Sequence, residues 1–196
     1  MDSTSAPELS VELEGIDDPT VLTKSRVVRA ADDRRDAVSA SCLRGRTWGI
    51  RAAGLSVVRV GVSSESVTFR EESGRSVFGC DNSPGPREEN RRWCGGAYSM
   101  LFDGRLRDSV LDLICDTGDG EPMGFVWIEP GRNARYVVVK QPGYAEVYEV
   151  AGGLPVRVAT TTGVEIEGSR ASLDVREHAA DGRLLRAYRL EAAVAG

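Results

Sequence analysis

The chain contains 196 residues, of which 41% are hydrophobic, and it carries a formal net charge of -5 at pH 7. This apolar content can build the core of one large domain or two small ones, and it excludes a disordered chain. The acidic balance argues against sequence-independent nucleic-acid binding, which needs a basic surface. Because no run of about eighteen apolar residues occurs, we predict no membrane span.

Residues 1–40 are the least regular part of the sequence, and we expect an N-terminal tail or tether there. The start, MDSTSAPELSVELEG, is acidic and polar, whereas a secretory signal has a basic start and an apolar middle. Residues 8–14, ELSVELE, alternate well enough for an edge strand. The stretch that follows could open as a short helix, with Asp18 as its cap and Pro19 in the first turn.

Short alternating segments dominate the rest of the chain. In SVVRVGV, residues 56–62, Val58 and Val60 face one way and Arg59 faces the other, as in a half-buried strand. SVTFRE, residues 66–71, has the same pattern. Turn dipeptides separate such segments, and each is expected to close a hairpin, which predicts an all-β sandwich or barrel-like architecture. These dipeptides are Ser73–Gly74, Asp103–Gly104, Pro142–Gly143, Gly152–Gly153 and Asp181–Gly182.

Several features recur with an offset close to 79 residues, which indicates an internal duplication. Trp48 recurs as Trp127, Val57 as Val137, and the tetrapeptide DGRL of 103–106 as 181–184. We therefore predict two tandem antiparallel β units, residues 41–114 and 115–196, of about six strands each. The last segment, RLLRAYRLEAAVA (183–195), also suits a helix, but the duplication favours a strand.

The four cysteines, Cys42, Cys80, Cys94 and Cys115, form no CxxC pair. This spacing disfavours a zinc site and a thioredoxin-like redox site, and an even count fits disulfides. Of three pairings we favour Cys80 with Cys94 and Cys42 with Cys115; the first would close a loop in the first β unit. Such bridges predict an extracytoplasmic or secreted protein whose leader or anchor is absent from this numbering. The alternative is a cytoplasmic protein with four free thiols.

Catalytic motifs are weak throughout. DTG at 116–118 is the aspartic-protease triplet, but the other unit has no matching DTG and Asp119 stands where a small residue is expected. Asp116, Asp119 and Glu121 form a weak calcium candidate without the EF-hand spacing. His178, the only histidine, is expected to be exposed at a strand end, and no serine nearby is marked as a nucleophile. We assign no catalytic residue, no metal site and no cofactor, and the sequence favours a non-enzymatic protein while leaving an enzyme open.

Aromatic residues are the remaining candidates for a binding role. Trp48 and Trp127 are expected in the core. Trp93 follows Arg91 and Arg92 in the loop between two cysteines, where these three residues could make a recognition surface. Tyr144 and Tyr148, on an expected hairpin, could make a second binding patch.

These patterns favour a non-enzymatic extracytoplasmic interaction module that binds another protein or a surface polymer. A small-ligand or carbohydrate-binding domain is the alternative, and a hydrolase that uses Asp116 or His178 is a weaker one. The sequence leaves the oligomeric state open.

Overall fold

The computed structural model describes residues 9–29, 52–60, 65–71, 76–82, 97–101, 109–116, 122–141, 143–160 and 164–193. All regular structure in these ranges is β-strand, which confirms the predicted all-β class. Within them, no helix is long and apolar enough to cross a membrane. The strands are β1 (Thr20–Arg29), β2 (Ala52–Val60), β3 (Glu65–Glu71), β4 (Ser76–Asn82), β5 (Ala97–Leu101), β6 (Val110–Asp116), β7 (Pro122–Ile128), β8 (Tyr136–Gln141), β9 (Tyr144–Glu149), β10 (Val156–Thr160), β11 (Glu165–Glu167), β12 (Arg170–His178) and β13 (Leu184–Ala193).

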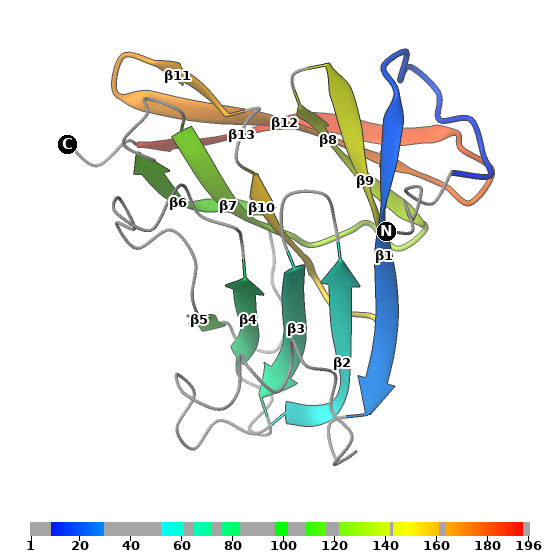
Figure 1. The fold of residues 1–196 in the computed structure, drawn as a ribbon, viewed down its shortest axis with the longest axis vertical. Coiled ribbons are helices and arrows are strands. Elements are labelled where there is room, and N and C mark those ends of the chain that lie inside the picture. The colour runs from blue at the N-terminus through cyan, green and yellow to red at the C-terminus, as the bar shows by residue number, and fades with distance from the viewer. Residues whose placement is uncertain are drawn as a thin grey trace, which may run out of the picture.

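The strand β1 belongs to two sheets. Its residues 20–23 run parallel to β9, and its residues 24–29 run antiparallel to β2. We call the strands on the β9 side sheet A (β11, β12, β13, β8, β9) and those on the β2 side sheet B (β2, β3, β4, β5). Sheet C, in the order β10-β7-β6, lies between them in Figure 1. None of the described sheets closes on itself, so a barrel is not confirmed.

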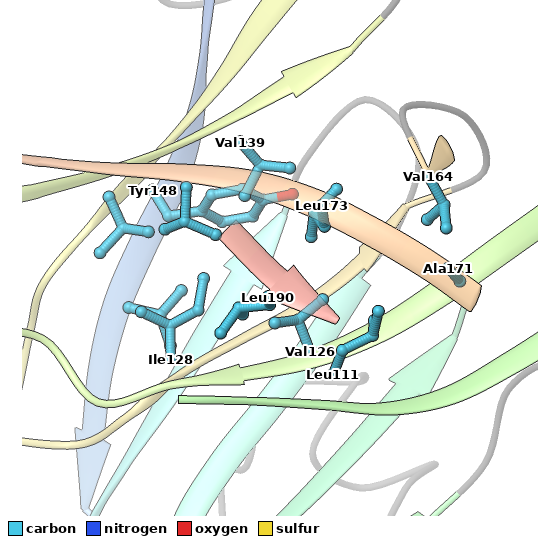
Figure 2. Packing of buried hydrophobic residues seen from close by; sticks show 12 residues of the cluster. Leu111, Val126, Ile128, Val139, Tyr148, Val164, Ala171, Leu173 and Leu190 are labelled. Carbon is cyan, nitrogen blue, oxygen red and sulfur yellow. The ribbon is translucent and has the colours of Figure 1, made fainter. Parts of the chain in front are cut away.

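Sheet C packs one face against sheet A to form an apolar core. Val126 and Ile128 of β7 point into this core, as do Leu173 and Val175 of β12, because alternate residues of a strand share a face. Figure 2 shows Val126 and Ile128 on one side of this core and Leu173 on the other. Burial of each such side chain contributes about 1.5–3 kcal/mol. The cluster comprises Leu111, Val126, Ile128, Val137, Val139, Tyr148, Val156, Val164, Ala171, Leu173, Val175 and Leu190.

The N-terminal segment covers the outer face of sheet A. Leu13 is buried there against Val138, Ala145 and Val147. The backbone N–H of Glu14 donates to the carbonyl of Gly182, 3.0 Å away. The edge strand expected at 8–14 is therefore wrong where the structure describes it, because residues 9–14 pack their apolar side chains without pairing as a strand.

The helix that could have opened at Asp18 is also wrong. Residues 20–29 form β1 instead, and several of them are β-branched, which favours an extended chain. The strand pairs on both sides, so this part of the predicted tail is integral to the sheets. Residues 30–40 lie outside the described ranges.

The turn predictions have mixed outcomes. Asp181–Gly182 joins β12 to its antiparallel partner β13, which confirms the last segment as a strand. Gly143 lies between the paired strands β8 and β9, as expected. The hairpin expected at Gly152–Gly153 is wrong, because this turn carries the chain from β9 in sheet A to β10 in sheet C. Ser73–Gly74 and Asp103–Gly104 lie outside the described residues, although β3 and β4 on either side of Ser73–Gly74 do pair.

The two halves of the chain pair their strands differently. β2, β3, β4 and β5 form a continuous antiparallel meander, whereas β8 and β9 form a hairpin and β10 then leaves for sheet C. The internal duplication is therefore not confirmed by the topology, and the boundaries at 41 and 115 stay predictions.

Candidate functional site in the polar interior

The space between sheets B and C is lined by polar residues. Strand pairing places Val57, Thr68 and Gly79 in one row and Arg59 and Ser66 in the next row of the same face. Arg59, Ser66 and Thr68 are all buried. The predicted half-buried strands are thus wrong for β2 and β3, because the neighbouring Val58 and Val67 on the opposite face are buried as well.

Gly79 sets the distance between sheets B and C. A Cβ built on Gly79 would lie 2.6 Å from Cη2 of Trp127 and still closer to the side chain of Arg157. Only glycine allows this approach of one sheet to the other. Trp127 and Arg157 are cross-strand partners, and the Arg157 guanidinium lies 4.8 Å from the indole centroid. Trp127 is fully buried, so its predicted core role is confirmed.

Arg59, like Arg157, is an arginine of this interior that is only 1% exposed. Its Nη2 donates to the carbonyl oxygen of Glu149 over 3.4 Å, while Nε and Nη1 have no hydrogen-bond partner. Burial lowers the pKa of Arg59 to about 10, against the opposing effect of Tyr148 and Glu149. Burying an ion without a partner costs several kcal/mol, on the order of the whole stability of many domains.

A second polar group lies beside it, where β1 crosses from sheet A to sheet B. Thr23 Oγ1 donates to Oε1 of the buried Glu146 over 2.9 Å. Burial raises the pKa of Tyr148 well above its usual value, and the nearby Glu146 carboxylate adds to this. Burial also raises the pKa of Tyr144, with a further contribution from Glu146. Ionisable groups with shifted pKa values are therefore concentrated around β9 and β2. Such groups occur more often at functional sites than elsewhere in proteins.

A third polar network fastens sheet A to the end of β7. The buried Glu177 carboxylate accepts from Arg186 Nε and Nη2 (2.9 and 2.6 Å), from the Tyr188 hydroxyl (3.0 Å) and from the Gly131 backbone N–H (2.8 Å). The Tyr188 oxygen also lies 3.2 Å from Ser109 Oγ. Burial is the main cause that raises the pKa of Tyr188 to about 12. Because both carboxylate oxygens of Glu177 accept hydrogen bonds from the protein itself, we interpret this network as structural.

His178 is buried, contrary to the expectation of an exposed histidine, because the N-terminal segment covers this face of sheet A. Its Nε2 lies 3.0 Å from the carbonyl oxygen of Glu14, so Nε2 carries the proton and donates. A nucleophile or substrate would have to displace residues 9–16 to reach it. This placement weakens the reading of His178 as a hydrolytic base.

Of the acidic residues considered as a calcium site, the structure describes only Asp116. Asp116 ends β6 opposite Pro122, and Asp119 and Glu121 lie outside the described residues. Among the residues that the structure places, no three metal-ligating side chains gather. The calcium candidate and the Asp116 hydrolase therefore gain no support.

The aromatic and cysteine predictions are tested only in part. Tyr148 is buried and Tyr144 half-buried, both on the inward face of β9, so Tyr148 does not belong to an exposed patch. Cys80 and Cys115 have backbone positions in β4 and β6. The residues outside the described ranges are Cys42, Trp48, Arg91, Arg92, Trp93 and Cys94. Both disulfide pairings stay predictions.

Sequence reasoning missed Arg59 and Arg157 because it assigned isolated charges in strands to a solvated face. A signal was present, since each arginine stands in the tripeptide Val-Arg-Val within a short apolar strand. A charged residue in an apolar run is buried when both faces of the strand are covered. Glu146, in Ala-Glu-Val, follows the same pattern.

Comparisons with protein-family models, curated proteins and solved structures found no match to this chain.

Proposed function

We propose that the protein is a non-enzymatic extracytoplasmic module that binds another protein or a surface polymer through the segment joining β4 to β5. One observation carries this proposal. β4 ends at Asn82 and β5 begins at Ala97, so fourteen residues, 83–96, connect two neighbouring antiparallel strands. About two to five residues are enough for such a connection, and loops longer than about twelve residues are uncommon in compact domains and include many binding loops.

The composition of this segment supports a binding role. It contains Arg91, Arg92 and Trp93, and arginine and tryptophan are the residue types most enriched at the energetic centres of protein interfaces. Cys80 pairs in the sheet with Ala97, and Cys94 stands three residues before Ala97 in the sequence. A Cys80–Cys94 disulfide would therefore close the segment at its base and reduce the entropy lost on binding. Such a disulfide would also indicate that the protein resides in an oxidising compartment.

The roles of the buried acid and base residues support a non-enzymatic reading. Glu177 accepts four hydrogen bonds, Glu146 is bound by Thr23, and His178 donates to Glu14. Each of these residues holds parts of the fold together.

Replacing Arg91, Arg92 and Trp93 together with alanine tests the proposal. Immobilised protein would be incubated with an envelope extract of the producing organism, and each captured component would then be purified and its Kd measured by calorimetry. We expect at least a tenfold loss of affinity, since single interface centres contribute about 2 kcal/mol or more. The exposed residues Arg132 and Arg183, changed together to alanine, provide the charge-matched control. Unchanged Kd in the triple variant would refute the proposal.

The predicted disulfide is tested separately. Peptide mapping of unreduced protein should yield a cross-linked peptide that contains Cys80 and Cys94. Recovery of both cysteines as free thiols from protein prepared without reductant would remove the support for an extracytoplasmic location.

A second candidate function is small-ligand binding inside the polar interior. It is favoured by Arg59, whose buried guanidinium leaves Nε and Nη1 without acceptors. A buried donor of this kind is the feature that small-molecule sites use to orient a ligand.

A further inference from the structure

The interior between sheets B and C has more hydrogen-bond donors than the described chain satisfies. Besides the two nitrogens of Arg59, the hydroxyl of Thr68 and the indole N–H of Trp127 are buried and have no partner. Native proteins pair nearly all such groups, so an ion, a ligand or water is expected to pair this set.

These donors belong to one region of the fold. Arg59 and Thr68 lie on the neighbouring strands β2 and β3, two positions apart along the ladder and on the same face. Residues in such a diagonal relation have Cβ atoms about 7–8 Å apart. Thr68 pairs with Gly79, and Trp127 passes directly over Gly79. Thr68 therefore lies beside the glycine that Trp127 covers, which places the donors of both sheets in the same interior.

The nearest carboxylates of β9 are engaged elsewhere. The Glu146 carboxylate accepts from Thr23, and the Glu149 carboxylate turns to the half-exposed Arg135, whose Nη2 lies 3.0 Å away. Only the backbone carbonyl of Glu149 reaches Arg59. Arg157, fully buried over Trp127, adds a second positive charge to the same interior. The region is therefore rich in positive charge and in donors.

We propose that this interior binds one small oxyanion, a carboxylate or phosphate group, between sheets B and C. Arg59 supplies the charge and the donor pair, and the Thr68 hydroxyl and Trp127 N–H supply neutral donors. Oxyanions match this set because each oxygen accepts several hydrogen bonds and pairs with the planar guanidinium. Close packing of the two sheets at Gly79 limits the ligand to a few non-hydrogen atoms or to the charged end of a larger molecule. The inference rests on the small-ligand candidate and is independent of the 83–96 segment.

Thermal unfolding of the full chain, followed by tryptophan fluorescence, tests the proposal. The midpoint would be measured in increasing phosphate, sulfate and acetate, each against chloride at the same ionic strength. We expect the midpoint to rise steadily with the logarithm of concentration for at least one oxyanion, because a ligand of the native state stabilises by mass action. The same midpoint in all four salts would overturn the proposal, and would indicate that water alone satisfies these donors.

Two variants decide whether Arg59 is responsible. Arg59→Met keeps a long apolar stem but removes the charge, so its midpoint should not respond to the oxyanion. In chloride it should unfold at the same temperature as the wild type or higher, because an unpaired buried charge has been removed. A full response in Arg59→Met would contradict the assignment. If Arg59→Met does not fold, Thr68→Val replaces only the hydroxyl with a methyl group. The midpoint of Thr68→Val should still rise with the oxyanion, but less than that of the wild type. A rise as large as in the wild type would contradict the assignment.

Two controls separate this inference from the proposed surface. Arg135→Met removes a half-exposed arginine and should keep the full oxyanion response. The Arg91, Arg92 and Trp93 triple-alanine variant should also keep it. Loss of the response in Arg135→Met would show that general surface charge, and not the interior, binds the anion.

Discussion

The two faces of sheet C lie in different chemical environments. Toward sheet A, Val126 and Ile128 pack against valine and leucine side chains, which require close packing but no hydrogen-bond partners. Toward sheet B, Trp127 and Arg157 lie over Gly79, on the face that also carries Arg59 and Thr68, two buried residues with unpaired donors. The strand β1 joins the two outer sheets, so one continuous sheet lines both spaces. The comparison separates an apolar A–C interior that stabilises the fold from a polar B–C interior for which we propose binding.

The largest effect is expected from a cavity in the apolar interior. Leu173→Ala should lower the free energy of unfolding by about 2–5 kcal/mol, because the buried site loses contacts that the packed valines cannot restore. Urea denaturation monitored by circular dichroism would measure it. Ile166→Ala, at a residue that is 46% exposed, is the control and should change stability by less than about 0.5 kcal/mol. Equal losses in both variants would mean that the A–C interior is not the stabilising core.

A smaller effect is expected where sheets B and C touch. Gly79→Ala should cost about 1–3 kcal/mol, because its Cβ would collide with Trp127 and Arg157. Combining it with Trp127→Phe, which shortens the ring, should recover part of the loss in a double-mutant cycle. Strictly additive effects of the two changes would show that the sheets do not approach at this glycine.

The smallest effect concerns a polar group at the border of the apolar interior. Tyr188→Phe should cost about 0.5–1.5 kcal/mol at neutral pH, since it removes the hydrogen bond to Glu177. The raised pKa of Tyr188, about 12, means that unfolded protein ionises first. The stabilisation is therefore complete below about pH 10, and it decreases as the pH rises to about 12. Unfolding midpoints between pH 9 and 12 should fall less steeply in Tyr188→Phe. Parallel curves for wild type and variant would contradict this assignment.

Local patterns in the sequence predicted local structure well. Alternation identified the strands at 56–62 and 66–71, the Asp181–Gly182 turn placed β13, and Trp127 is buried as expected. These features depend on residues close together in the chain. The choice between strand and helix for β13 was settled by its long antiparallel pairing with β12, which overrides helix propensity.

Contacts between distant residues could not be predicted in the same way. Nothing near Thr20 indicates that β1 will pair with β9 and β2 at once, and nothing near Leu13 indicates the sheet beneath it. The burial of Arg59 depends on both faces of β2 being covered, which a two-residue periodicity cannot reveal. The candidate site was missed for that reason, and the predicted surface residues Arg91, Arg92 and Trp93 lie outside the described ranges.

The double membership of β1 also sets the order in which the protein can be completed. Thr23 and Glu146, which hydrogen bond across β1 and β9, are 123 residues apart in the sequence. During synthesis, β1 must therefore wait for most of the chain before its sheet A partner exists, while its β2 partner emerges much earlier. An unpaired strand edge of this kind is prone to wrong pairing, and contacts of such long range make folding slow. Sheet B is thus the part expected to form first on the ribosome. β1 can pair with sheet A only after β9 has been made.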